Sequence, residues 1–280
     1  MGHYPLWEYT LFIVILMIAG LFAGFVGSFF GVGGGTILVP SFLIVYSLIN
    51  PDLSIDMHQA VAASLALTMF NTFSAARKHH HLGNLPFHYF KGWAIGLTAG
   101  SIIGGVLVAF TPSYFLKMMF TAYLLLAVIY GCIKRPTEST FTSEKNAPQG
   151  VKKNVAAVII GGVSVLLGLA GGTFTTPFFN FFGYPIKKSM AIAVAGGVII
   201  GFVGTFAAIL AGYHVPDRLP FSWGYINIVS VVVVAPFVMF SSPWGVKLAT
   251  RISDRRLHWL YVGFLTLLFI YLMLELTMNI

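Results

Sequence analysis

Two copies of one short motif carry the clearest chemistry in this sequence. Residues 34–40 read GGTILVP and residues 171–177 read GGTFTTP, and each copy follows a long apolar run and opens a short one. Glycines this dense permit unwound backbone and the close approach of another chain or a ligand. A helix that restarts at Thr36 or Thr173 would present free N–H groups and the positive end of its dipole, both of which attract anions. The pair therefore predicts an anion site that needs no charged side chain, with tight helix packing by small residues as the alternative.

Polar side chains inside neighbouring apolar runs could add hydrogen bonds to such a site. Ser64, Thr68 and Asn71 follow one another at helical spacing and share one helix face. Substrate lining is one interpretation of this face, and hydrogen bonding between helices is the other. The candidate substrate-binding residues are Gly33, Gly34, Gly35, Thr36, Ser64, Thr68, Asn71, Gly171, Gly172, Thr173 and Asn180.

Residues for other kinds of chemistry are missing from the apolar runs. No Asp or Glu lies deep in any run, Cys132 is the single cysteine, and no Cys/His spacing suggests a zinc site. An intramembrane enzyme usually needs an ionisable or metal-ligating cluster, so we expect no catalytic residue, no metal and no cofactor. The lack of buried carboxylates argues against a cation pump and leaves proton coupling without an obvious carrier.

The elements that must hold the site are long apolar segments. Hydrophobic residues make up 58% of the 280 and charged residues only 9%, whereas an ordinary soluble domain carries about 25% charge. Two short runs, 36–49 and 173–183, could be half-helices, re-entrant pieces or short spans. Eight runs meet or approach the roughly 20 residues of a membrane span: 9–30, 58–76, 88–110, 114–133, 154–170, 188–212, 222–243 and 257–276. The sequence predicts an all-α polytopic membrane protein.

The chain divides into two similar halves. Residues 134–153 are the only linker-like stretch and separate a first transmembrane repeat, 1–133, from a second, 154–280. Both halves contain, in the same order, a GGTxxxP motif, a helix of small residues and a Leu-Pro-Phe sequence before the fourth segment. We interpret them as two repeats of about five segments each.

Basic residues predict the orientation of these repeats. The formal net charge is +8, but the 16 Lys and Arg residues form short clusters between apolar runs, which indicates topology and not a nucleic-acid surface. Placing Arg77 and Lys78 in the cytoplasm puts all the others except Lys117 and Arg218 there by alternation. Five segments per half is an odd number, so the second repeat is inverted, with both termini outside and the linker cytoplasmic. Four crossings per half would give parallel repeats, which the charge rule disfavours.

The motifs also resemble a known family. GVGGGTILVP at 31–40, followed by the Ala-rich segment 60–76, is similar to the TauE/SafE family of sulfite and sulfonate exporters, and GLAGGTFTTP at 168–177 fits as the second copy. The resemblance covers nearly the whole chain. It implies a transporter of the cytoplasmic membrane that exports small anions such as sulfite, sulfoacetate or related sulfonates. Ala170 replaces one glycine of the GGG run, which would make the two half-sites unequal.

Together these observations predict a secondary transporter that exports a small anion, sulfite or an organosulfonate. An anion channel with the same pore and a membrane assembly partner without transport activity are the alternatives. The expected partners are the anionic substrate and the lipid bilayer, with no nucleic acid. Coupling to protons or another ion, and assembly into a homo-oligomer, are left open by the sequence.

Overall fold

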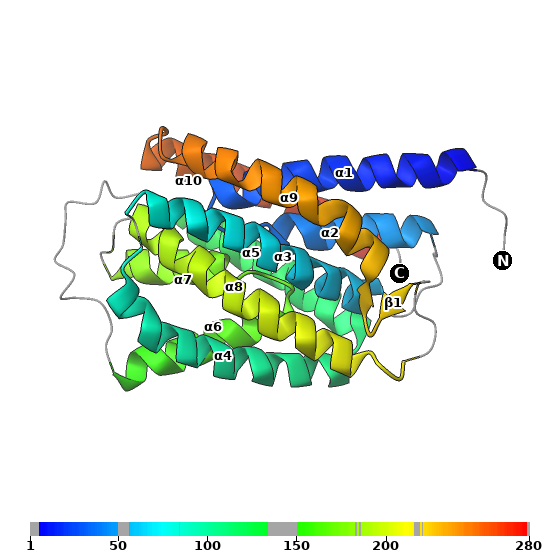
Figure 1. Cartoon of the computed structure of the whole chain (residues 1–280), viewed down its shortest axis with the longest axis horizontal. Coiled ribbons are helices and arrows are strands. Elements are labelled where there is room, and N and C mark those ends of the chain that lie inside the picture. Colours follow the sequence, from blue (N-terminus) through cyan, green and yellow to red (C-terminus); the bar gives the residue numbers. More distant parts are fainter. Residues whose placement is uncertain are drawn as a thin grey trace.

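The chain folds into a bundle of helices that run nearly parallel or antiparallel to one another (Figure 1). The computed structural model describes residues 6–49, 56–83, 85–133, 150–182, 184, 186–215, 219 and 221–278. The described residues form ten helices and one two-stranded hairpin, which confirms the predicted all-α class. The helices are α1 (Leu6–Phe29), α2 (Gly35–Ile49), α3 (Asp56–His81), α4 (Phe87–Phe110), α5 (Ser113–Ile133), α6 (Val151–Leu166), α7 (Gly172–Phe181), α8 (Ile186–Ala211), α9 (Ile228–Ala249) and α10 (Asp254–Met278).

Five of these helices, as far as the structure describes them, are long and apolar enough to cross a membrane: α4, α5, α8, α9 and α10. They expose large apolar side chains such as Phe110, Leu126 and Leu267, which are 81%, 66% and 70% exposed. Helix α3 is less apolar, but every residue from Met57 to Thr68 is buried. A helix that other helices surround need not present an apolar surface to lipid. The chain is therefore a multi-pass membrane protein.

Both short helices begin inside the bundle, at the ends of two turns that we call the first glycine loop (residues 30–34) and the second glycine loop (residues 167–171). After α1, the N–H groups of Val32 and Gly33 donate to the carbonyl oxygen of Gly27 at 2.9 and 3.1 Å, so the chain turns back beside α1. After α6, the N–H of Leu169 likewise donates to the carbonyl oxygen of Ser164, at 2.8 Å, and the chain turns back there too. Helices α2 and α7 have 15 and 10 residues. At about 1.5 Å per residue, neither covers the roughly 30 Å of a hydrocarbon core.

Helices of one half pack against helices of the other. α1 lies along α9, α6 lies along α4, and α3 and α8 pack together, as do α5 and α10. Small residues allow the closest of these contacts: a Cβ on Gly100 of α4 would collide with the backbone of Val158 in α6, and one on Gly104 with the backbone of Gly162. Gly96, Gly100 and Gly104, spaced four residues apart on α4, thus serve close helix packing.

One predicted span was misplaced. The run 222–243 does not start as a helix: Ser222–Trp223 and Ile226–Asn227 form an antiparallel hairpin, β1 and β2, and α9 begins only at Ile228. Gly224 turns the hairpin with φ +62°. The apolar side chains of Tyr225 and Ile226 pack against Ala62, Ala66 and Ala208, so they cover the end of the bundle and do not face lipid.

The described Lys and Arg residues, with the exception of Lys117 near the start of α5, gather at one end of the molecule. The last turn of α3, the starts of α6, α8 and α10, and the end of α9 all lie there, whereas the start of α1 and the end of α10 lie at the other end (Figure 1). Lys187 of α8 donates to the carbonyl oxygen of Thr250 after α9, at 3.5 Å. This grouping is what the charge-based orientation requires, although which end faces the cytoplasm stays a prediction.

Candidate functional site

The two glycine loops interlock in the interior of the bundle. A Cβ on Gly35 would lie 2.5 Å from the carbonyl oxygen of Gly168. In the second motif, a Cβ on Gly172 would collide with the carbonyl oxygen of Gly31. Gly35 matches Gly172 and Gly168 matches Gly31 when the motifs are aligned, so each loop makes the same contact with the other. Only glycine permits this approach, because any side chain would push the two loops apart.

The centre of this contact joins two matching residues, Gly33 and Ala170. A Cβ on Gly33 would collide with the Cβ of Ala170 and lie 2.8 Å from Cγ2 of Thr72. Gly33 adopts φ +78°, a conformation that side chains disfavour, whereas Ala170 is not in the left-handed region. The reciprocal contacts are those expected near a two-fold axis, and the different backbone at Gly33 and Ala170 makes the two loops unequal.

Each glycine loop ends at the N-terminus of a short helix. The carbonyl oxygen of Gly34 accepts the first N–H bonds of α2, from Ile37 and Leu38 at 2.9 Å each, and Gly171 plays this part for α7. Ahead of these bonds, four N–H groups have no acceptor among the described residues: those of Gly35, Thr36, Gly172 and Thr173. Free N–H groups and the positive dipole end at a helix N-terminus bind anions.

Four buried hydroxyl groups face one another beside these helix ends. The Tyr123 hydroxyl of α5 lies near those of Thr36, Thr173 and Tyr261, the last from α10. None of the four forms a hydrogen bond of ordinary length and angle with the described residues. Thr36, Thr173 and Tyr123 are only 0%, 7% and 7% exposed. A buried hydroxyl without a partner costs about 1–3 kcal/mol, so four in one place call for a ligand or water that pairs with them.

Aromatic contacts position the two tyrosines. Tyr123 packs edge-on against Phe174 of α7, with ring centroids 5.1 Å apart, and Tyr261 packs against Phe30 of the first glycine loop at 5.0 Å. Sequence reasoning missed both tyrosines, because α5 and α10 are apolar on all sides and give no signal of which face turns inward. Tyr123 follows Thr121 and Ala122 in a run that resembles any lipid-facing helix.

Ser64 and Asn71, both predicted to line the site, lie on α3 and contact the backbone of the glycine loops. The Ser64 hydroxyl donates to the carbonyl oxygen of Gly168 at 2.7 Å. Asn71 accepts a hydrogen bond from Ser28 at 2.9 Å, and its amide nitrogen lies 2.7 Å from the place where a Cβ of Gly34 would be. These contacts place the two side chains against loop backbone, where they fix the position of the helix ends.

Thr68 and Asn180 complete the predicted set. Thr68 is fully buried on α3, and its hydroxyl has no hydrogen-bond partner among the described residues. Asn180 lies in α7, but its side chain is outside the part of the chain that the structure describes. The structure thus brings together the two GGT motifs, places Ser64 and Asn71 behind them, and adds Tyr123 and Tyr261.

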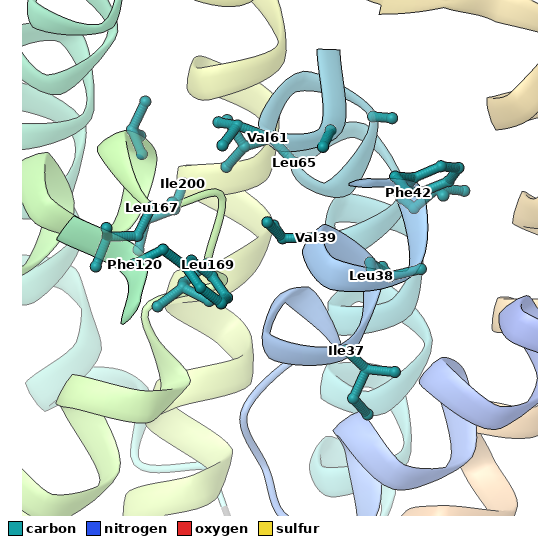
Figure 2. Packing of buried hydrophobic residues seen from close by; sticks show 14 of the residues in the cluster. Ile37, Leu38, Val39, Phe42, Val61, Leu65, Phe120, Leu167, Leu169 and Ile200 are labelled. Carbon is teal, nitrogen blue, oxygen red and sulfur yellow. The ribbon is translucent and has the colours of Figure 1, made fainter. Parts of the chain in front are cut away.

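Buried apolar side chains pack around the two glycine loops. Val39 of α2 points toward the second glycine loop, between Leu38 and Leu169 (Figure 2), and a Cβ on Gly168 would lie 2.8 Å from its Cγ2. Leu38, Val39 and Leu169 are all buried. In this low-dielectric setting, hydrogen bonds and helix dipoles act on a charge far more strongly than they would in water.

The site offers only neutral hydrogen-bond donors. Within the described part of the chain, no three His, Cys, Asp or Glu side chains come together as metal ligands would. The groups present can bind an oxyanion through N–H and O–H donors. The fold and this site define a class: a polytopic membrane protein with two opposed half-helices that meet at its centre.

Comparison with known proteins identifies the family. The sequence model described as sulfite exporter TauE/SafE matches residues 16–272. The chain belongs to this family of membrane transporters, which confirms the resemblance seen in its motifs. No solved structure matches the chain.

Relatives in distant organisms match over most of their length. A probable membrane transporter protein of Methanocaldococcus jannaschii is 27% identical over 264 residues, which cover 90% of this chain and 91% of the relative. Another, of Haemophilus influenzae, is 24% identical over 241 residues, covering 86% and 90%. A third, of Bacillus subtilis, is 22% identical over 258 residues, covering 86% and 90%.

Proposed function

We propose that this protein is a secondary transporter that exports sulfite or a small organosulfonate across the cytoplasmic membrane. The observation that carries the proposal is the pairing of two opposed helix N-termini with four buried hydroxyls, those of Thr36, Thr173, Tyr123 and Tyr261, which face one another without a hydrogen bond of ordinary length and angle. A sulfo group presents three oxygens that accept hydrogen bonds. Donors from α2 and α7 would reach it from two sides, and the hydroxyls of α5 and α10 from a third.

Alternating access would arise from rocking of one half against the other. The reciprocal contacts of Gly35 with Gly168 and of Gly172 with Gly31 support a two-fold relation between the halves. In our proposal the halves are inverted repeats, with the site at their common axis. Helix α1 of the first half packs on α9 of the second, and α6 of the second half packs on α4 of the first. Each half therefore holds a helix of the other, and we expect the two halves to move about the contact between the glycine loops. We assign the protein no catalytic role.

Flux into proteoliposomes tests the proposal. We expect saturable uptake of sulfite or a sulfonate, and little uptake of chloride. Thr36→Val and Tyr123→Phe each remove one hydroxyl while keeping the shape of the side chain. A hydrogen bond to a charged group is worth about 1.5–3 kcal/mol, so each variant should raise the half-saturation concentration roughly tenfold or more.

The matched control is Thr98→Val in α4. The Thr98 hydroxyl donates to Ala94 of its own helix at 2.9 Å, and its loss should leave flux unchanged. Gly35→Leu is less informative as a test, because its side chain would strike the backbone of the second glycine loop and disturb folding as well as binding. Absence of flux of any anion by folded protein would refute the proposal.

The same assay separates the alternatives. An anion channel would show flux that does not saturate and that exceeds the turnover of a transporter by orders of magnitude. A membrane assembly partner would show no flux, and the two hydroxyl variants would then behave like the Thr98→Val control.

A further inference from the structure

We infer that the site accepts an oxyanion head with a single negative charge, so that sulfite is carried as hydrogensulfite and the substrate itself carries the proton. The inference rests on the proposed function and goes beyond it, because it specifies the charge of the bound head and the origin of any proton coupling. Its basis is the absence of charged side chains around the described hydroxyl cluster, together with the charge that two helix ends can balance.

No charged side chain of the described residues approaches the cluster. Helices α2 and α7 contain no charged residue, and their one titratable group is the phenol of Tyr46 in α2. The titratable groups that face the site are the phenols of Tyr123 and Tyr261. The next ones along those helices are Lys117 and His258. The His258 ring is hydrogen-bonded to the carbonyl oxygen of Gly131 at 2.9 Å, at the end of α5.

The helices that surround the half-helices carry their charged and titratable residues near their ends. These are Glu8 and Tyr9 on α1, Asp56, His58 and the run Arg77–His81 on α3, Lys152 and Lys153 on α6, and Lys187 and Lys188 on α8. Within the part of the chain that the structure describes, the buried site therefore has dipoles and hydroxyls, but no cation, with which to balance the charge of a ligand.

Two helix ends balance about one charge. The N-terminus of a helix acts like roughly half a positive charge, and α2 and α7 together supply roughly one. The Born cost of moving an ion out of water grows with the square of its charge, so an oxyanion head with two charges costs about four times as much as one with a single charge. The two helix ends balance the first charge, and the neutral hydroxyls supply no opposite charge for the second.

Proton coupling then needs no carboxylate in the protein. On one side of the membrane, sulfite takes up one proton to become hydrogensulfite, crosses in the site, and on the other side releases that proton to become sulfite again. One proton moves with each sulfite. A sulfonate carries a single charge on its sulfo group at all neutral pH values, so its transport moves no proton.

Paired substrates in proteoliposomes test this inference. Sulfate and methanesulfonate are both tetrahedral and of similar size, but their charges differ. We expect methanesulfonate to be transported at least tenfold faster than sulfate. Sulfite flux, at constant subsaturating total sulfite and equal pH on both sides, should fall about tenfold per pH unit on the alkaline side of its second ionisation. Methanesulfonate flux over the same pH range should stay constant, which excludes titration of the tyrosines.

A pH-sensitive dye inside weakly buffered vesicles gives an independent readout. With the lumen set on the alkaline side of the second ionisation, sulfite entry should acidify it by about one proton per molecule, whereas methanesulfonate entry should not, and vesicles without protein correct for passive entry. Sulfite flux that rises with pH, entry without acidification, or sulfate flux equal to that of methanesulfonate would overturn the inference while leaving the transporter intact. No flux of any of the three anions would refute the proposed function itself.

Discussion

Thr36 and Thr173 occupy matching positions in the first turns of α2 and α7, and each keeps a buried hydroxyl without a partner. Such a group lowers the stability of the protein when neither a ligand nor a water pairs with it. A fold retains this kind of defect where a ligand repairs it. Stability and binding should therefore respond in opposite directions when the hydroxyl is removed.

Substitution of Thr36 by Val tests that opposition. We expect the free energy of unfolding of the empty protein, measured by denaturation in detergent, to stay the same or to rise by up to about 3 kcal/mol. The rise in Tm on adding sulfite or methanesulfonate should shrink, because binding contributes to stability through its affinity.

Ser64→Ala is the control for this measurement. It removes the hydrogen bond to Gly168, which is 2.7 Å long, and should lower the free energy of unfolding by about 1–3 kcal/mol. If Thr36→Val destabilised the empty protein as much as Ser64→Ala does, the Thr36 hydroxyl would have a protein partner, and its proposed role toward an anion would be wrong.

The sequence was informative about these residues where backbone chemistry dominates. The GGT motifs marked both helix starts to within one residue, because dense glycine followed by Thr is a strong local signal. Tyr123 and Tyr261 were not found, since the orientation of a uniformly apolar helix depends on its neighbours. Ser64 and Asn71 were found as polar residues, but only the folded chain shows that they contact loop backbone.

At the scale of helices, α4 and α6 depend on glycine for their spacing. A Cβ on Gly100 would collide with the backbone of Val158, so the helices would have to move apart and lose contacts along their length. We expect Gly100→Ala to lower the free energy of unfolding by about 1–3 kcal/mol, the usual cost of overpacking.

Gly263→Ala in α10 is the matched control, because no atom of another segment lies within 4 Å of where its Cβ would be. Alanine favours helix over glycine by up to about 1 kcal/mol, so this variant should be neutral or more stable. Equal effects of the two substitutions in denaturation experiments would show that the α4–α6 contact is not rigid.

The helices themselves were predictable from apolar run length, with one exception. At 221–227 the sequence FSWGYIN continues the apolar run, yet Gly224 turns the chain and Asn227 caps α9 by accepting a hydrogen bond from the N–H of Ser230 at 2.9 Å. Hydropathy averages over a window and cannot see a two-residue turn. The pairing of α1 with α9 and of α6 with α4 also lay beyond the sequence, because many helix neighbours are compatible with the same runs.

For the whole molecule, the orientation in the membrane is open to a direct test. The charge rule places the linker end in the cytoplasm and both termini outside. In the structure, the start of α6 and the end of α10 lie at opposite ends of the bundle (Figure 1). Cys132 is the single cysteine. In a Cys132→Ser background, a single new cysteine placed at one end of the bundle can therefore show on which side of the membrane that end lies.

Lys152→Cys and Thr277→Cys provide the two reporters. Both side chains are exposed, and Thr277 bonds only within its own helix, to Met273 and Leu274. We expect a membrane-impermeant maleimide to label Thr277→Cys in intact cells, and Lys152→Cys only after the cells are permeabilised. The reverse pattern would invert the whole topology and turn the predicted exporter site toward the other face. Labelling of both from outside would instead mean that one half crosses the membrane an even number of times, which would exclude an inverted repeat.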